Sequence, residues 1–562
     1  MPRFCLQSPT ESGLFYALLP ALFILCTLPK RFITNLTNIG TTLAVTYSVD
    51  MLIKTYGSAV FGVDAITITI EVSIGSGNKY HIVGLPDNAV KESLRRIESA
   101  IQASGLKMPR QKIVVNLSPA DIRKEGTSYD LPIAVGILAA SGQILSELAD
   151  QFVIAGELSL DGGLQPIKGA LPIAVQTHKA GFKGFILPED NSREAAVVDD
   201  LQIYGMRNLK ELIAFFNGKQ SFSPTIVNTR DEFLKNTGLY EQDFSDVKGQ
   251  ESIKRALEIA AAGGHNVILI GPPGAGKTML AKRLPTILPP LNLYEALETT
   301  KIHSVAGKLN VADSLITERP FRNPHHSISI TAMVGGGTNP QPGEISLAHN
   351  GVLFLDELPE FKRDVLEVMR QPLEDRKITI SRSRLSVDYP AGFMLIASMN
   401  PCPCGFYNHP DKECSCSPWV VQKYLNKISG PLMDRIDLHV EVTPVNFSDL
   451  SSLQPAEKSG MIRERVIEAR CIQDKRFAKH IDLHYNAQMS PNLVRKICTI
   501  NDEGRVLIKK AMEKLNLSAR AYDRILKVSR TIADLAASEE IGLEHLAEAI
   551  HYRSLDRDHW AG

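Results

Sequence analysis

Apolar and polar residues alternate along residues 63–75, and this alternation predicts a half-buried β-strand. Side chains of a strand point in turn to its two faces, so one face of this strand is apolar and faces a core. The apolar positions are Ile66, Ile68, Ile70, Val72 and Ile74. Further strands are expected at 112–119, 152–160 and 184–188, and helices at about 87–104, 129–141 and 168–180. This mixture predicts a compact α/β domain over residues 51–215.

The pattern changes twice beyond this domain. Residues 216–245 are polar and irregular, which is typical of a linker. A second α/β region is expected at 246–450, and residues 451–562 show the pattern of amphipathic helices. A chain of 562 residues is too long for a single hydrophobic core, which agrees with several domains.

The first fifty residues do not fit this pattern. Residues 13–29 (GLFYALLPALFILCTLP) form an apolar run of signal-peptide length that is short for a membrane span. One interpretation is a membrane anchor. We favour the other, in which residues 1–50 are a non-native or wrongly annotated extension and translation begins at Met51, because no cleavage site or second apolar segment supports export. We expect no membrane contact unless the 13–29 segment is genuine.

Composition indicates an ordinary globular protein, with 44% hydrophobic and 22% charged residues. Basic and acidic residues each number 62, so contact with nucleic acid would have to come from local patches. Four of the eight cysteines are scattered, at Cys5, Cys26, Cys471 and Cys498. This scatter argues against a secreted disulfide framework and favours a cytoplasmic protein.

A glycine-rich loop follows an apolar stretch at residues 266–284 (NVILIGPPGAGKTMLAKRL). The segment GPPGAGKT fits the phosphate-binding pattern GxxxxGK[ST] between a strand and a helix. Backbone N–H groups of such a loop hold a polyphosphate, the lysine reaches the β and γ phosphates, and the threonine coordinates Mg²⁺. The expected ATP-binding residues are Gly271, Pro272, Pro273, Gly274, Ala275, Gly276, Lys277 and Thr278.

Two further strands are predicted to end near this loop. Residues 351–361 (GVLFLDELPEF) end an apolar strand in adjacent carboxylates, which we assign to Mg²⁺ binding (Asp356) and to polarising the attacking water (Glu357). Residues 393–400 end in Asn400, whose amide is suited to orient that water or to sense the γ phosphate. The pattern therefore favours ATP hydrolysis over binding alone.

Four cysteines lie in an insertion at residues 400–418. They are Cys402, Cys404, Cys414 and Cys416, two CxC pairs separated by nine residues. Four thiolates can surround one tetrahedral Zn²⁺, and His409 is an alternative for one sulfur. Redox disulfides and unligated thiols are the rival interpretations, although CxC rings are strained and the cytosol keeps thiols reduced. We expect a structural zinc that holds together a segment too poor in apolar residues to fold alone.

A basic segment precedes the strand that ends in Asn400. Residues 376–390 (RKITISRSRLSVDYP) predict a β-hairpin with four cations, which are Arg376, Lys377, Arg382 and Arg384. Such a cluster can follow a phosphate backbone, and it can equally be a solvated basic edge.

Together these motifs resemble the AAA+ ATPases, and within them the magnesium-chelatase-like branch. The chain from Met51 onward resembles the YifB/ComM family through the segments RPFRNPHHSISITAMVGGG (319–337), GPLMDRIDLHVEV (430–442) and LSARAYDRILKVSRTIADL (517–535). The resemblance implies an α/β fold class with three parts. These are an N-terminal domain like the Lon protease domain (ribosomal S5-like), an AAA+ P-loop core with a parallel sheet, and an all-helical C-terminal lid domain.

The resemblance also implies a ring, most simply a homohexamer. Arg435 of MDRID would be the arginine finger that enters a neighbouring subunit's ATP site, where a cation offsets transition-state charge. A salt bridge from Arg435 to Asp434 or Asp437 is the alternative. Arg520 of LSARAY would be the sensor arginine of the lid, with Arg524 as a lesser candidate.

Similarity to Lon raises a protease hypothesis. Ser128 stands where the nucleophilic serine of that family lies, but the lysine partner falls at Leu171, which cannot accept a proton. Lys168 lies one helical turn earlier and off register. We therefore disfavour an ATP-dependent protease and expect Ser128 to start a helix.

ComM-like proteins are associated with natural transformation as hexameric helicases that drive branch migration. The resemblance thus implies an ATP-dependent DNA motor that acts on single-stranded or branched DNA during homologous recombination, with the basic hairpin facing the central channel. The alternative is an ATPase subunit of the magnesium-chelatase type, from which the Lon-like domain and the cysteine insertion are departures.

Overall fold

The computed structural model of the chain describes residues 51–553, except 236–239, 312, 338–339, 383–384, 408, 410–411, 445–455, 481–482 and 516. The apolar run at 13–29 and the hypothesis about residues 1–50 lie outside the described residues. Across the described ranges, no helix combines the length and apolar character needed to cross a bilayer.

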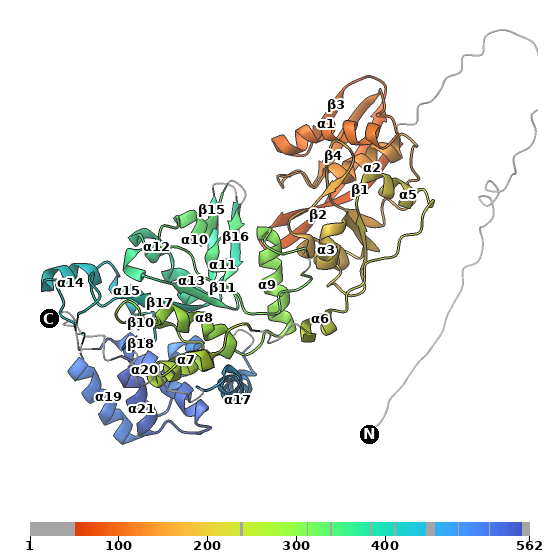
Figure 1. The fold of residues 1–562 in the computed structure, drawn as a ribbon. Helices are drawn as coiled ribbons and strands as arrows, with labels where there is room; N and C mark the ends of the chain where they lie inside the picture. Colours follow the sequence, from red (N-terminus) through yellow and green to blue (C-terminus); the bar gives the residue numbers. More distant parts are fainter. Residues whose placement is uncertain are drawn as a thin grey trace, which may run out of the picture. The chain divides into compact units, whose positions relative to one another are not determined.

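The N-terminal region is built on a seven-stranded mixed sheet, in the order β3-β4-β2-β1-β5-β8-β9 (Figure 1). A long antiparallel hairpin, β1 with β2, lies at its centre. The alternation in β2 is confirmed, because Ile68, Ile70 and Val72 are fully buried. The strands are β1 (Met51–Phe61), β2 (Asp64–Gly75), β3 (Tyr80–Val83), β4 (Lys112–Ser118), β5 (Phe152–Ile154), β8 (Gly184–Pro188) and β9 (Gln202–Met206).

The predicted helices of this region are confirmed as α1 (Asn88–Ala103), α2 (Asp130–Ala140) and α3 (Ala170–Lys179). The strand expected at 152–160 is instead broken into β5 and β6 (Glu157–Leu158). Gly156 leaves the sheet between them, because its N–H donates to Ser128 O at 2.9 Å and its carbonyl accepts from Leu131 N at 3.1 Å. These bonds tie the strand break to the start of α2.

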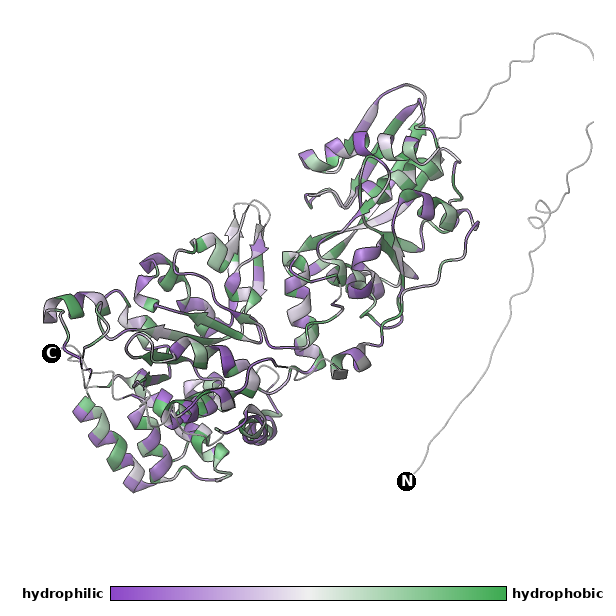
Figure 2. Ribbon diagram, viewed as in Figure 1, coloured by the Kyte–Doolittle hydropathy of each residue, from purple (hydrophilic) through white to green (hydrophobic). Residues whose placement is uncertain are grey.

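Five parallel strands form the second sheet, in the order β11-β14-β17-β10-β18. Three of them are fully buried and apolar except for Ser398, as expected for a parallel sheet covered on both faces, and Figure 2 shows the centre of this sheet in green. The strands are β10 (Val267–Ile270), β11 (Phe321–Arg322), β14 (Val352–Leu355), β17 (Met394–Met399) and β18 (Leu438–Glu441). Their carboxyl ends carry the predicted ATP-site residues.

Helices make up the described C-terminal region. They are α17 (Ser459–Phe477), α18 (Pro491–Ile497), α19 (Asp502–Leu515), α20 (Ala519–Leu535) and α21 (Leu543–His551). Both α17 and α20 pack on α7 (Glu251–Gly263), the helix that precedes β10. The predicted linker at 216–245 is not wholly irregular, since it contains the short helix α6 (Thr229–Lys235).

Candidate nucleotide-binding site

The glycine-rich loop joins β10 to α8 (Lys277–Ile287). Gly274 and Gly276 have φ values of 82° and 83°, a left-handed conformation that favours glycine. A Cβ at Gly271 would lie 2.2 Å from Val442 O, so glycine alone lets the loop pass the end of β18. The local sequence thus folds into a tight turn that ends at a helix N-terminus, which is an anion-binding arrangement.

Lys277 places its ammonium group among oxygen atoms of this loop. Its Nζ donates to Gly271 O at 2.7 Å, to Pro272 O at 2.9 Å and to Asn400 Oδ1 at 3.1 Å. Burial lowers the pKa of Lys277, and the negative charges of Asp356 and Glu357 act in the opposite direction. A buried ammonium whose hydrogen-bond partners are neutral is well suited to receive a phosphate.

Asp356 lies at the meeting point of three elements. Its Oδ2 accepts from Thr278 Oγ1 of α8 at 2.8 Å, and its Oδ1 accepts from Ser398 of β17. A hydroxyl in contact with a carboxylate supplies the oxygen donors that Mg²⁺ prefers, so these residues fit the metal. Ser398 was not anticipated, although it faces Asp356 from the strand that ends in Asn400.

Glu357 is exposed and sits directly after β14 with φ 54°, in the left-handed region. That backbone turn, rare for a residue other than glycine, separates its carboxylate from that of Asp356. His326 Nδ1 lies 3.7 Å from Glu357 Oε2. His326 belongs to the segment RPFRNPHHS, for which no chemical role was predicted, and its pairing with a strand end distant in sequence could not be found from local spacing.

Arg435 is buried and paired within its own chain. Its guanidinium forms an ion pair with Glu374 Oε1 at 2.6 Å and donates to Pro431 O at 2.6 Å. The side chain is 9% exposed. The predicted alternatives, Asp434 and Asp437, are therefore not its partners.

Asp437 is instead held by residues of two other elements. Arg524 of α20 pairs with its Oδ1, and His265 Nδ1 lies 3.3 Å from its Oδ2. Burial opposes the charge of Asp437, yet Arg524 and His265 hold its pKa far below the usual range. Arg520 is exposed on the same helix, 3.8 Å from Asp434.

The four clustered cysteines converge. Their sulfur atoms all lie within 4.8 Å of one another, and three of the pairs are 3.3, 3.5 and 3.7 Å apart. A tetrahedron of sulfurs at the usual zinc distance has edges of about 3.8 Å, so the residues fit Zn²⁺. Within the searched part of the chain the group does not include His409. The thiols are free, which does not match a disulfide.

The cysteine cluster adjoins the phosphate loop. A Cβ at Gly405 would lie 2.5 Å from Pro273 Cδ, so the two loops are in close contact. Burial opposes ionisation of the Cys404 thiol, but hydrogen bonds from the Phe406 backbone and the Cys402 thiol lower its pKa to about 5. The pKa values of Cys414 and Cys416 are instead raised, because the backbone hydrogen bonds that these thiols accept are outweighed by burial and the neighbouring sulfurs. Zinc ligands are thiolates, so a bound cation would be needed to ionise these two thiols at neutral pH.

The predicted basic hairpin forms, as β15 (Lys377–Arg382) with β16 (Leu385–Pro390). Of its four cations, the structure describes the side chains of Arg376 and Lys377. Arg376 follows α13 (Arg370–Asp375) before the hairpin, and burial lowers its pKa to about 10, although Tyr485 and Asp437 act in the opposite direction. Lys377 pairs with Asp388 at 3.4 Å. Arg384 and the side chain of Arg382 lie outside the described residues.

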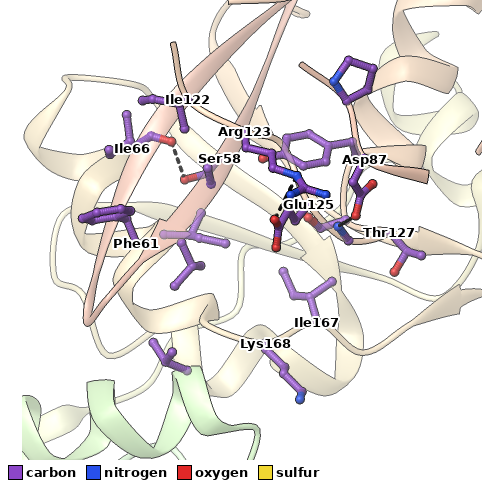
Figure 3. Close-up of a pocket in the computed structure, with 18 of the residues that line it drawn as sticks. Ser58, Phe61, Ile66, Asp87, Ile122, Arg123, Glu125, Thr127, Ile167 and Lys168 are labelled. Atoms are coloured by element: carbon purple, nitrogen blue, oxygen red, sulfur yellow. Dashed lines mark hydrogen bonds and ion pairs between the residues drawn. The ribbon is translucent and has the colours of Figure 1, made fainter. Parts of the chain in front are cut away.

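A cavity of 1040 Å³ is lined mainly by the N-terminal region, including Ser128 and Lys168, and is completed by Val305, Pro340, Gln341 and Ser386 of the second α/β region. Figure 3 shows Lys168 extending away from Thr127, the residue before Ser128. Leu171 is fully buried among Val197, Leu291, Ala296 and Leu315, so its position faces a core and not the cavity. Ser128 is not the helix cap that we expected, because Tyr129 occupies that position.

Comparison with known proteins decides the family. The competence protein ComM of Haemophilus influenzae is 44% identical over 505 residues, which cover 89% of this chain and 97% of that protein. The chain belongs to the YifB/ComM family. YifB of Escherichia coli is 45% identical over 504 residues, 89% of this chain and 96% of the relative. Lon protease 2 of Bacillus subtilis is 33% identical over 159 residues, 26% of this chain and 27% of the relative.

Family models agree with this membership. They are magnesium chelatase, subunit ChlI (residues 243–450), subunit ChlI of Mg-chelatase (70–191) and magnesium chelatase, subunit ChlI C-terminal (456–553). The predicted family is therefore confirmed, and the chain is a member of the magnesium-chelatase-like AAA+ class. Membership of this class implies ATP and Mg²⁺.

Proposed function

We propose that this YifB/ComM family member is a cytoplasmic, ATP-driven DNA motor. It acts as a homohexameric helicase on single-stranded or branched DNA and promotes branch migration during homologous recombination in natural transformation. The chain is 44% identical to a protein named for competence, over 97% of that protein. This similarity favours a DNA motor over a chelatase subunit or a protease.

The observation that carries the proposal is the meeting of Lys277, Asp356 and Asn400 from three different elements at one edge of the parallel sheet. Lys277 leaves its carbonyl partners for the β and γ phosphates, and the N–H groups of the loop hold the remaining phosphate oxygens. Thr278 and Asp356 would hold Mg²⁺, and the ion would supply charge neutralisation at the β and γ phosphates.

Glu357 then polarises a water molecule for attack on the γ phosphorus. The bond from phosphorus to the β-γ bridging oxygen breaks, ADP leaves, and the proton of the water passes to the Glu357 carboxylate. Asn400, which already faces Lys277, orients the water or senses the γ phosphate. Because Glu357 is exposed on the side of His326, it is free to turn toward the phosphate when nucleotide binds.

We further propose that hydrolysis requires two subunits. Arg435 acts as the finger for a neighbouring ATP site, and Arg520 acts as the sensor arginine of a helical lid formed by the C-terminal region. Arg435 is paired with Glu374 in the single chain, so assembly must exchange that partner for the phosphate of the neighbour. Such an exchange couples turnover to the ring.

The cysteine cluster holds a structural zinc in this proposal. Four protein ligands leave no open coordination position, so the ion stabilises the insertion and takes no part in hydrolysis. Contact of this insertion with the phosphate loop at Gly405 and Pro273 supports a role in shaping the ATP site.

A strand-displacement assay tests the function. Forked and three-stranded DNA are incubated with ATP and the wild type, Lys277→Ala or Glu357→Gln. We expect unwinding by the wild type only, with nucleotide binding lost in Lys277→Ala and retained in Glu357→Gln. Unwinding that does not depend on ATP, or the absence of DNA binding at low salt, would contradict the proposal.

A magnesium-chelatase-type ATPase subunit is the second candidate, favoured by the family models that span most of the described chain. In that case a tetrapyrrole and partner subunits, and not DNA, would stimulate ATP turnover. Measuring turnover with forked DNA and with a porphyrin separates the two.

A further inference from the structure

Exposed cations gather at the β3 edge of the N-terminal sheet, away from every residue assigned above. Lys79 precedes β3 and Lys112 opens β4, and the two lie side by side because Ile113 N donates to Lys79 O at 3.0 Å. Lys107 and Arg110 lie in the connection from α1 to β4. All four side chains belong to exposed residues. We call Lys79, Tyr80, Lys107, Arg110 and Lys112 the basic edge.

These cations differ from others in the same region by lacking acidic partners. Lys54 pairs with Glu71 at 3.3 Å, and Arg96 pairs with Asp130 at 2.7 Å. No ion pair joins the four cations of the basic edge to a carboxylate among residues that the structure describes. Like charges held together on one surface repel one another, and an anionic partner relieves that repulsion.

An aromatic side chain stands among these charges. Tyr80 is 39% exposed, and its hydroxyl donates to Pro109 O at 3.3 Å. This bond ties the ring to the connection that carries Lys107 and Arg110. An exposed ring close to cations is a combination with which proteins bind single strands, because bases stack on the ring while cations follow the phosphates.

We propose that the basic edge binds single-stranded DNA, which gives the N-terminal domain a role as a second DNA contact in addition to the ring channel. This inference rests on the proposed DNA motor function. The contacts are with phosphates and one base face, so binding is independent of sequence and sensitive to salt.

The test measures binding of a fluorescent oligothymidine to the full chain at several salt concentrations. Each phosphate contact with a single strand adds about 0.7 to the slope of log K against log salt. Lys79→Gln/Lys112→Gln should therefore flatten the slope by about 1.4 and weaken binding. The matched control is Lys179→Gln/Lys210→Gln, which removes two exposed lysines of the same domain and should leave the slope unchanged.

A second variant separates stacking from charge. Tyr80→Ala should weaken binding by about fivefold or more without changing the slope, whereas Tyr80→Phe should bind as the wild type does. Thermal unfolding of each variant checks that the domain is intact.

Three outcomes are distinguishable. If the wild type binds oligothymidine and unwinds forks but Lys79→Gln/Lys112→Gln matches its control, the basic edge is excluded and the motor function stands. The same holds if the double variant only aggregates more readily, since lysines on an edge strand also prevent strand pairing. If the wild type binds no DNA at low salt, both proposals fall.

Discussion

The ammonium group of Lys277 lies 3.1 Å from Oδ1 of Asn400, although 123 residues separate the two in the chain. This contact joins the phosphate loop to the end of β17, the strand next to β10. Because the two strands are parallel, their carboxyl ends meet at one edge, and the amide is held where the γ phosphate would arrive.

Asn400→Ala should separate hydrolysis from binding. The phosphate loop still holds the nucleotide, so the Kd for ATP should change little, while kcat should fall about tenfold to a hundredfold, as for a lost hydrogen bond to a charged group. Measuring ATP binding by titration and turnover by phosphate release checks this. If the affinity for ATP fell tenfold to a hundredfold and kcat did not change, Asn400 would be assigned to binding alone.

We proposed that Arg435 leaves Glu374 for the ATP site of a neighbouring subunit. This exchange predicts that two inactive variants restore ATP turnover when they are mixed. Arg435→Ala and Lys277→Ala should each be inactive, with a loss of about 10³-fold or more for the missing finger. In mixed rings an intact loop of one chain can face an intact arginine of the other, so a mixture should regain part of the turnover. Failure of mixtures to recover, with rings formed, would place Arg435 in a structural role.

Sequence reasoning predicted the strands, the loop and the helix around the proposed ATP site well, because their signals are local. The loop pattern, the carboxylates after an apolar strand and the β2 alternation each depend on neighbours in sequence, and the observed elements agree. Partners distant in the chain were missed. Neither the pairing of Arg435 with Glu374 nor that of His326 with Glu357 follows from spacing, because both need the order of strands in the sheet.

Arg376 also shows that sequence spacing alone does not predict the surroundings of a side chain. Its place in a run of cations suggested that it lies on the surface. At the junction of a helix and a hairpin, however, the direction of a side chain is set by the packing of the two elements. The backbone at Arg376 is left-handed, with φ 56°, and the residue is only partly exposed. A run of cations in the sequence therefore did not place Arg376 on an open surface.

Removing one cysteine of the cluster tests whether the four thiols bind zinc. Native mass spectrometry should find about one zinc per chain, and Cys402→Ser should lose it with a Tm several degrees lower, since metal binding stabilises the folded insertion. Cys471→Ser is the matched control, because Cys471 is an exposed free cysteine outside the cluster. Wild-type protein without metal but with an unchanged Tm would contradict the zinc assignment.

Asp437 predicts how stability depends on pH. Arg524 and His265 hold its native pKa far below the value of about 3.9 expected in the unfolded chain. The unfolded state thus takes up a proton first on acidification, so this contribution to the free energy of unfolding is complete above about pH 5 and declines below it, by up to about 1.4 kcal/mol per pH unit.

Asp437→Asn should accordingly be destabilised most at neutral pH, by about 3–5 kcal/mol, because Arg524 loses its charged partner. The difference in unfolding midpoint from the wild type should narrow as the pH falls below 4. Asp502→Asn, at an exposed residue, is the control. A difference that stays constant with pH would show that the pKa of Asp437 is the same in the native and unfolded states, and would contradict this prediction.

Leu171→Lys should not create a protease. The position is fully buried, and its backbone N–H donates to Glu194 Oε1 at 2.9 Å, so α3 is fixed with this side chain in the apolar cluster. A lysine there must lose its charge or break the cluster, and stability should fall by several kcal/mol. Casein should remain intact with this variant and with Ser128→Ala. Because the cavity holds Ser128 but not position 171, only a rotation of α3 could bring the two together, and cleavage by Leu171→Lys that Ser128→Ala abolishes would prove such a rotation.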